Sequence, residues 1–148
     1  MRKLALALVL LMSVAAPRSA SADVGLGLFV GDPSGIDLKL DLSRRSALDI
    51  LLGWNTFREG RAGYGHVTYL FTLAAGRGRS VVVPLRLGIG GAVYGFRHDV
   101  DAGVRAPFEV GLRFRRTPIE IYGEIALFVT FLDDWWDVQG GLGLRFYF

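Results

Sequence analysis

The side chains best suited to nucleophilic chemistry are His66 and Thr68, which stand two positions apart. Side chains two positions apart on a β-strand share one face. A histidine beside a hydroxyl, with a carboxylate to orient the ring, can activate that hydroxyl as a nucleophile. The serines after residue 22 lie in or beside expected turns, none of them two residues from a histidine: Ser34, Ser43, Ser46 and Ser80. Because a single histidine in polar surroundings is more often a hydrogen-bonded structural group, we expect no catalytic residue.

Two acidic groups could offer carboxylate oxygens to a divalent cation. One is Asp99 and Asp101 beside His98, and the other is Asp133, Asp134 and Asp137. Acidic residues in loops are usually just solvated, so we predict no metal site. The glycine-rich stretches lack the strand-to-helix context of a phosphate-binding loop, and we therefore expect no cofactor.

The elements that hold these residues show the period of two that is typical of β-strands. Between residues 36 and 42 every second residue is apolar, and Asp37, Lys39 and Asp41 stand between them. Similar runs occupy 24–30, 48–54, 67–73, 81–89, 104–114, 119–131 and 137–148. No helical period occurs, and we expect a bulge near Tyr94 and Phe96. The predicted fold is all-β: an eight-stranded antiparallel up-and-down barrel formed by residues 23–148.

The first 22 residues are predicted to be a secretory signal peptide. Arg2 and Lys3 precede an apolar run over residues 4–16, and small residues at 20–22 form a cleavage site. This run is too short to cross a bilayer as a helix, which takes about 20 residues. We therefore expect export of the chain.

Removal of the leader makes the chain electrically neutral. The whole sequence has 17 Lys and Arg against 14 Asp and Glu, and the leader contains Arg2, Lys3 and Arg18. The remaining 14 against 14 argue against nucleic acid as a partner. The absence of cysteine excludes disulfides and a lipoprotein anchor.

The charged residues of the strands fall on the face opposite to the apolar stripe. A soluble lipocalin-like barrel that binds an apolar ligand would place the apolar stripe inside, whereas a transmembrane barrel places it on lipid. Glycine on the polar face and nearly balanced charge favour a crowded interior, because buried charges need partners. We therefore predict a transmembrane barrel with a lumenal charge network, formed by Asp37, Lys39, Asp41, Asp49, Arg86, Arg105, Glu109, Arg113, Glu120, Glu124 and Arg145. Arg115 and Asp137 are counted on the same polar face.

Two patterns can be checked against a structure. A two-residue turn at Arg116-Thr117 would place Arg113 opposite Glu120, and Glu109 opposite Glu124, a repulsive pair unless an arginine bridges it. Aromatic residues should form girdles at both ends of the barrel: Trp54, Trp135 and Trp136 at one end, and Phe114, Phe146 and Phe148 at the other.

Two stretches carry a resemblance to a known family. Residues 28–36 contain a Gly-Asp-Pro-Ser-Gly turn before the second strand, and residues 140–148 form an alternating closing strand that ends on phenylalanine. Both resemble small bacterial outer-membrane barrels of unassigned function, in the OmpA/OmpX-like eight-stranded class. The resemblance implies a location in the bacterial outer membrane after passage through the periplasm. It also implies contact with outer-membrane lipids and insertion by the barrel-assembly machinery, for which the signal would be Leu142, Leu144, Phe146 and Phe148.

The same resemblance sets the expected orientation and one alternative activity. With both ends of the barrel chain in the periplasm, the turns at 44–45, 77–79 and 115–116 would face the periplasm, and their charged residues are all arginine. Some small outer-membrane barrels modify lipids with a His-x-Ser pair, where this chain has His66 and Thr68. We expect a monomer with a structural or surface-interaction role and no open pore. The alternatives are the lipocalin-like binder and a lipid-modifying enzyme that uses His66.

Overall fold

The computed structural model describes residues 23–56, 63–96, 99–131 and 136–148. Several expectations fall outside these residues: the signal peptide, most of the connection between 55 and 63, and the residues His98, Asp133, Asp134 and Trp135. No helix of the described chain is long and apolar enough to cross a membrane.

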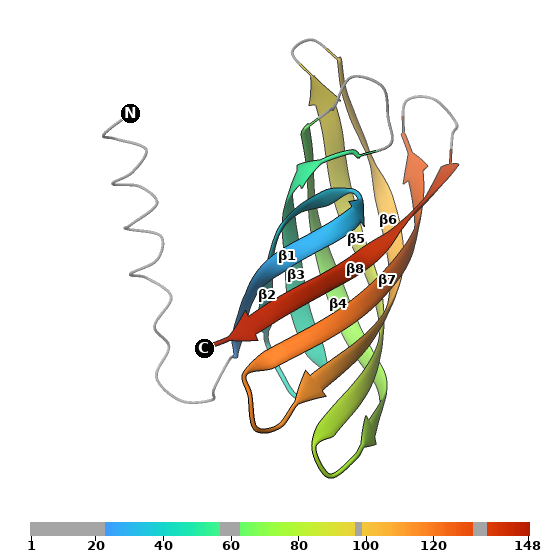
Figure 1. Ribbon diagram of the computed structural model, residues 1–148. Coiled ribbons are helices and arrows are strands. Elements are labelled where there is room, and N and C mark those ends of the chain that lie inside the picture. Colours follow the sequence, from blue (N-terminus) through green and yellow to red (C-terminus); the bar gives the residue numbers. More distant parts are fainter. Residues whose placement is uncertain (1–22, 57–62, 97–98, 132–135) are drawn as a thin grey trace.

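The described chain forms a closed barrel of eight antiparallel strands in sequence order (Figure 1). The strands are β1 (Val24–Asp32), β2 (Ser34–Asp41), β3 (Ser46–Trp54), β4 (Gly63–Arg77), β5 (Val81–Phe96), β6 (Asp99–Phe114), β7 (Ile119–Thr130) and β8 (Trp136–Tyr147). β8 pairs with β1 over eight residue pairs, among them Leu28 with Leu144, and this pairing closes the barrel. The predicted eight-stranded up-and-down barrel is therefore confirmed.

The pleat of each strand separates polar from apolar side chains. On β2, Asp37 and Lys39 are buried while Ile36 is exposed, and on β3 Asp49 is buried. Successive side chains of a strand point to opposite faces, so the charged set points into the lumen and the apolar set points outward. The soluble lipocalin-like alternative required the reverse arrangement.

Some apolar side chains point into the lumen, because the pleat of the strand sets their direction. Leu51 is 2% exposed, whereas its neighbour Leu52 is 67% exposed. The inward apolar residues form one cluster with Tyr64 and Tyr122: Phe29, Leu51, Ala92 and Phe128. The lumen therefore holds an apolar layer as well as charged ones.

The predicted bulge near Tyr94 and Phe96 is wrong. Strand β5 keeps one register against β6 from Val81 to Phe96, and the irregularity lies instead between Thr72 and Ala74 of β4. β6 also begins earlier than expected, at Asp99, so residues that were predicted to be a loop extend the β5–β6 hairpin. Cross-strand pairing overrides weak local alternation in this part of the sheet.

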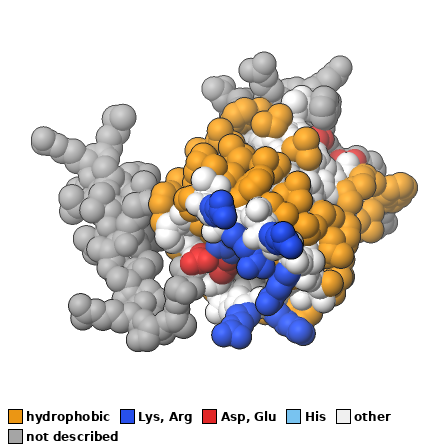
Figure 2. All heavy atoms as spheres, turned by 60° about the horizontal axis from the view of Figure 1, so that its bottom comes forward, with side chains coloured by type: hydrophobic (Ala, Val, Ile, Leu, Met, Phe, Trp, Pro, Cys, Tyr) orange, Lys and Arg blue, Asp and Glu red, His pale blue; other side chains and the backbone are white. Residues whose placement is uncertain are grey.

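The two ends of the barrel differ in their connections. At the turn end, three short connections (42–45, 78–80 and 115–118) lie beside the start of β1 and the end of β8. Figure 2 looks onto this end and shows hydrophobic side chains around the outside with Lys and Arg gathered within. At the opposite, loop end, Trp54 and Trp136 are exposed, whereas Phe114, Phe146 and Phe148 are exposed at the turn end. The described members of the two aromatic sets thus lie at opposite ends of the barrel.

Gly27 lies at a close approach of the two strands at the β1–β8 seam. A Cβ atom built on Gly27 would overlap the carbonyl oxygen of Leu144 and lie 2.9 Å from the Cα atom of Arg145. Backbone atoms cannot move away as a flexible side chain can, so only glycine fits here without a shift of β8. A Cβ on Gly91, by contrast, would meet nothing closer than 3.9 Å.

We predict that Gly27→Ala lowers the free energy of unfolding by about 1–3 kcal/mol, because it forces β8 away from β1. Gly91→Ala should change it by less than about 0.5 kcal/mol. Urea unfolding of both variants in detergent micelles measures the difference. Equal midpoints for the two variants would show that the seam is not tightly packed.

Candidate functional site in the barrel lumen

Arg145 of β8 is the most highly connected side chain of the lumen. Its guanidinium is fully buried and donates to Asp37 of β2, to Asp49 of β3 at 2.7 Å and to Glu109 of β6 at 3.0 Å. The same group lies 3.6 Å from the ring centre of Tyr122, the distance of a cation–π contact. None of the three carboxylate strands is a neighbour of β8 in the sheet. Arg145 therefore links strands across the lumen.

A second cluster lies nearer to the turn end. Arg86 of β5 donates to Glu109 and to Glu120, and Glu120 also accepts a hydrogen bond from the hydroxyl of Tyr147. The ammonium of Lys39 donates to Asp41 at 2.5 Å and to Tyr147 at 3.1 Å. Glu109 joins this cluster to the Arg145 cluster.

His66 and Thr68 of β4 belong to a third cluster, around Arg105. Arg105 donates to Glu124 and to the hydroxyl oxygen of Thr68 at 3.1 Å, and its Nη1 atom lies 2.9 Å from Nε2 of His66. His66 Nε2 lies 3.1 Å from a carboxylate oxygen of Asp49. In the described chain no hydrogen bond joins His66 to Thr68, so the structure does not pair them as base and nucleophile.

The predicted register between β6 and β7 is present, but the ion pairs differ from those expected. Arg113 stands opposite Glu120, and Glu109 opposite Glu124. Glu109 and Glu124 are neutralised by different arginines rather than bridged by one. Arg113 turns away from Glu120, since its guanidinium donates to Asp41 at 3.1 Å and to Asp23 at 2.5 Å.

All eleven residues of the predicted network lie on the inner face, and each of them forms an ion pair. Arg115 is exposed outside the lumen, and Asp137 is half-buried on β8. Sequence reasoning missed Asp23, which precedes β1, and the inward polar residues Tyr64 and Gln139, whereas the alternation on β7 and β8 places Tyr122 and Tyr147 on the charged face. For Tyr64 and Gln139 the period-two pattern was the available signal, because Tyr64 is in phase with His66 and Gln139 is in phase with Arg145.

Buried charges of both signs stabilise a protein only when they are paired, since removing an ion from water costs several kcal/mol. The buried carboxylates here are Asp37, Asp49, Glu109, Glu120 and Glu124, and the buried cations are Lys39, Arg86, Arg105 and Arg145. Glu109 is shared by Arg86 and Arg145, and Asp49 by Arg145 and His66, which keeps the set connected. In the described residues, no group of three or more His, Cys, Asp or Glu side chains is placed to hold a metal ion.

A closed eight-stranded sheet with an ion-paired lumen and an apolar exterior defines a small barrel that is inside-out relative to a soluble protein. Structural comparison agrees with this class. The N-terminal β-barrel domain of Pseudomonas aeruginosa OprF matches with a TM-score of 0.61 and 12% sequence identity, over 88% of this chain and 100% of that chain. Ail, the attachment invasion locus protein of Yersinia pestis, matches with a TM-score of 0.39 and 18% identity, over 85% of this chain and 94% of that one.

No protein-family model matches the sequence, and no curated protein does either. The likeness to the OprF barrel shows the fold. The chain has the eight-stranded fold of the small OmpA/OmpX-like barrels, as its two sequence motifs predicted.

We predict that Arg145→Gln lowers the free energy of unfolding by about 3–5 kcal/mol, because it leaves three buried carboxylates short of a cation. Arg113→Gln also removes two ion pairs, but the Arg113 side chain is 30% exposed at the turn end. Its loss should cost about 1 kcal/mol or less. Urea unfolding compares the two variants, and equal losses would contradict a special role for Arg145.

Proposed function

We propose that the chain is an integral protein of the bacterial outer membrane, with a structural or surface-interaction role and no open pore. The observation that carries this proposal is the apolar outer surface. Every strand contributes large apolar side chains that are at least 37% exposed, for example Leu28, Ile36, Leu52, Val67, Ile89, Val110, Ile125 and Leu142.

Such a surface surrounds the barrel instead of forming one patch. Soluble monomers rarely expose contiguous apolar patches of more than a few hundred Å², and a docking surface for a partner would occupy one side. Contact with water costs roughly 25 cal/mol for each Å² of apolar surface. A lipid bilayer removes this cost on all sides at once. The closed sheet also pairs the backbone N–H and C=O groups, for which lipid offers no hydrogen-bond partner.

The filled lumen supports the absence of a pore. An eight-stranded barrel has an interior that side chains can fill. Here the Arg145 cluster and the apolar cluster around Phe128 both occupy the lumen, and Tyr122 contacts Arg145 and packs in the apolar cluster. Diffusion of solutes would require both clusters to separate.

We also propose export by the leader at residues 1–22 and insertion by the barrel-assembly machinery. The outward alternation of Leu142, Leu144, Phe146 and Phe148 on and after β8 supports the second step, because an assembling partner can reach this stripe before the β1–β8 seam closes. His66 has a different role in this proposal. It is 4% exposed and lies among Asp49 and Arg105, which favours a structural function.

The test compares two arginine substitutions on the outer face. Ile125→Arg lies in the middle of β7, and Leu42→Arg lies just beyond β2 at the turn end. In a bilayer, the first should cost about 2–4 kcal/mol and the second about 0–1 kcal/mol, because the penalty depends on depth. The measurement is the fraction of folded barrel after refolding into lipid vesicles.

Folded and unfolded protein are separated by gel migration before and after boiling. We expect the wild-type band to shift on boiling, and the shifted fraction to fall for Ile125→Arg but not for Leu42→Arg. An unchanged band together with solubility without detergent would overturn the membrane proposal.

A further inference from the structure

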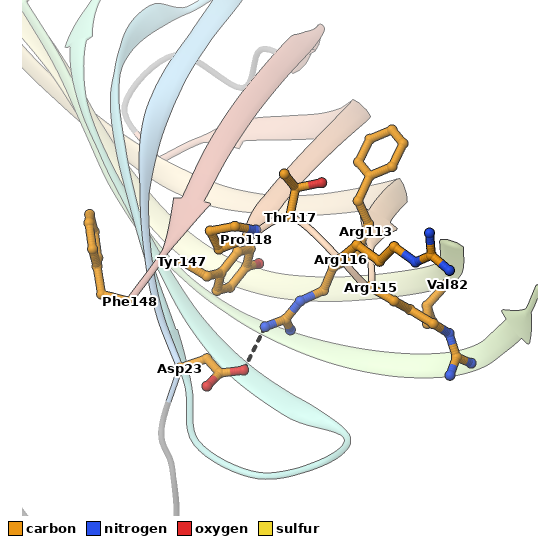
Figure 3. Close-up of a pocket in the computed structure, with 10 residues that line it drawn as sticks. Asp23, Val82, Arg113, Arg115, Arg116, Thr117, Pro118, Tyr147 and Phe148 are labelled. Carbon is orange, nitrogen blue, oxygen red and sulfur yellow. Dashed lines mark hydrogen bonds and ion pairs between the residues drawn. The ribbon is translucent and has the colours of Figure 1, made fainter. Parts of the chain in front are cut away.

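A pocket of about 570 Å³ lies at the turn end, beside the β6–β7 connection, the start of β1 and the end of β8 (Figure 3). Its walls include three arginines, Arg113, Arg115 and Arg116, together with Thr117. The volume is within the range of small-molecule sites, roughly 300–1,000 Å³.

The positive charge of the pocket is not fully neutralised. Asp23 is the acidic residue of the pocket wall, and it is held by Arg113, as the dashed line in Figure 3 shows. Arg113 is fixed further by Asp41 and by the ring of Tyr147, whose centre is 3.9 Å away. Arg115 and Arg116 are exposed and form no ion pair with any described residue. Two guanidinium groups are therefore free to bind an anion.

The pocket also has apolar walls on its outer side. Phe114 and Phe148 line it, and they are 37% and 79% exposed. Both belong to the outward stripe that faces lipid in the proposed function. The arginines thus begin directly after Phe114, where the apolar surface of β6 ends.

The surrounding surface favours anions. Exposed arginines lie at the other two turns of this end: Arg44 and Arg45 in one, and Arg79 in the other, with Arg77 at the end of β4. The three connections contain no acidic residue: 42–45, 78–80 and 115–118. Figure 2 shows this concentration of Lys and Arg. Clustered charge of one sign attracts ions of the other sign before contact.

We propose that this pocket binds the phosphate group of an anionic phospholipid headgroup, with the beginning of an acyl chain against Phe114 and Phe148. The inference rests on the proposed membrane location. Guanidinium groups match phosphate oxygens in a bidentate geometry, and the Thr117 hydroxyl can donate a further hydrogen bond. A free phosphate would satisfy the arginines equally but would leave the two phenylalanines without a partner.

The experiment uses folded barrel in neutral detergent micelles and native mass spectrometry to count bound lipid. The probes are phosphatidylglycerol and phosphatidylcholine with the same acyl chains, with inorganic phosphate as competitor. Arg115→Gln/Arg116→Gln removes the two free arginines of the pocket. The matched control is Arg45→Gln/Arg79→Gln, which removes the same charge from exposed residues of the other two turns at the same end, outside this pocket and outside the larger hollow beside it.

We expect wild-type protein to retain phosphatidylglycerol in preference to phosphatidylcholine. The pocket variant should bind at least about fivefold less of it, since two charge-assisted bonds are lost. The control should lose less than about twofold, because it changes only the long-range field. Phe114→Ala should weaken the binding of phosphatidylglycerol but leave any binding of inorganic phosphate unchanged.

Equal losses in the two arginine variants would overturn the pocket in favour of diffuse charge. No preference of the wild type for phosphatidylglycerol would overturn the proposal outright. Displacement of the lipid by millimolar inorganic phosphate would overturn the choice of a lipid headgroup. All samples must first show the boiling-dependent band shift. Failure of that shift bears on the membrane proposal, whereas failure of lipid selection in folded barrel bears only on the pocket.

Discussion

The guanidinium of Arg145 is held in the lumen by Asp37, Asp49 and Glu109, which come from β2, β3 and β6. Backbone pairing fixes only neighbouring strands, so contacts across the lumen are needed to fix the cross-section of the barrel. Burial makes the pairing mandatory, because one unpaired charge here costs several kcal/mol. The other clusters attach to this one through shared carboxylates: Glu109 joins Arg86, and Asp49 joins His66.

Because the ion-paired side chains lie in the lumen, the outer face can be apolar all around the barrel. The pleat forces each strand to divide its side chains between two faces, and the outer face is apolar on all eight strands. At the turn end that face stops at Phe114, and arginines without acidic partners follow. The polar lumen, the apolar outer stripe and the basic rim thus all follow from one alternating pattern and from the points where it ends.

Much of this arrangement could be predicted from the sequence. The period of two identified eight strands, and counting from the 116–117 turn placed Arg113 opposite Glu120. The partners of Arg113 and Arg145 could not be predicted, because they lie on strands that are not adjacent in the sheet. The inward position of Leu51 could not be predicted from its hydrophobicity either, since the pleat of the strand sets the direction of its side chain. The bulge in β4 depends on pairing with β5, and no local pattern marks it.

The central claim is that the apolar face contacts lipid while the lumen does not. Leu51 and Leu52 test it within one strand, because they are adjacent and are 2% and 67% exposed. In labelled barrel reconstituted into lipid nanodiscs, NMR cross-relaxation between leucine methyl groups and lipid acyl chains reports direct contact. The account predicts strong transfer to the methyl groups of Leu52 and none to those of Leu51 or the inward Leu70. Transfer to Leu51, or its absence at Leu52, would contradict the account.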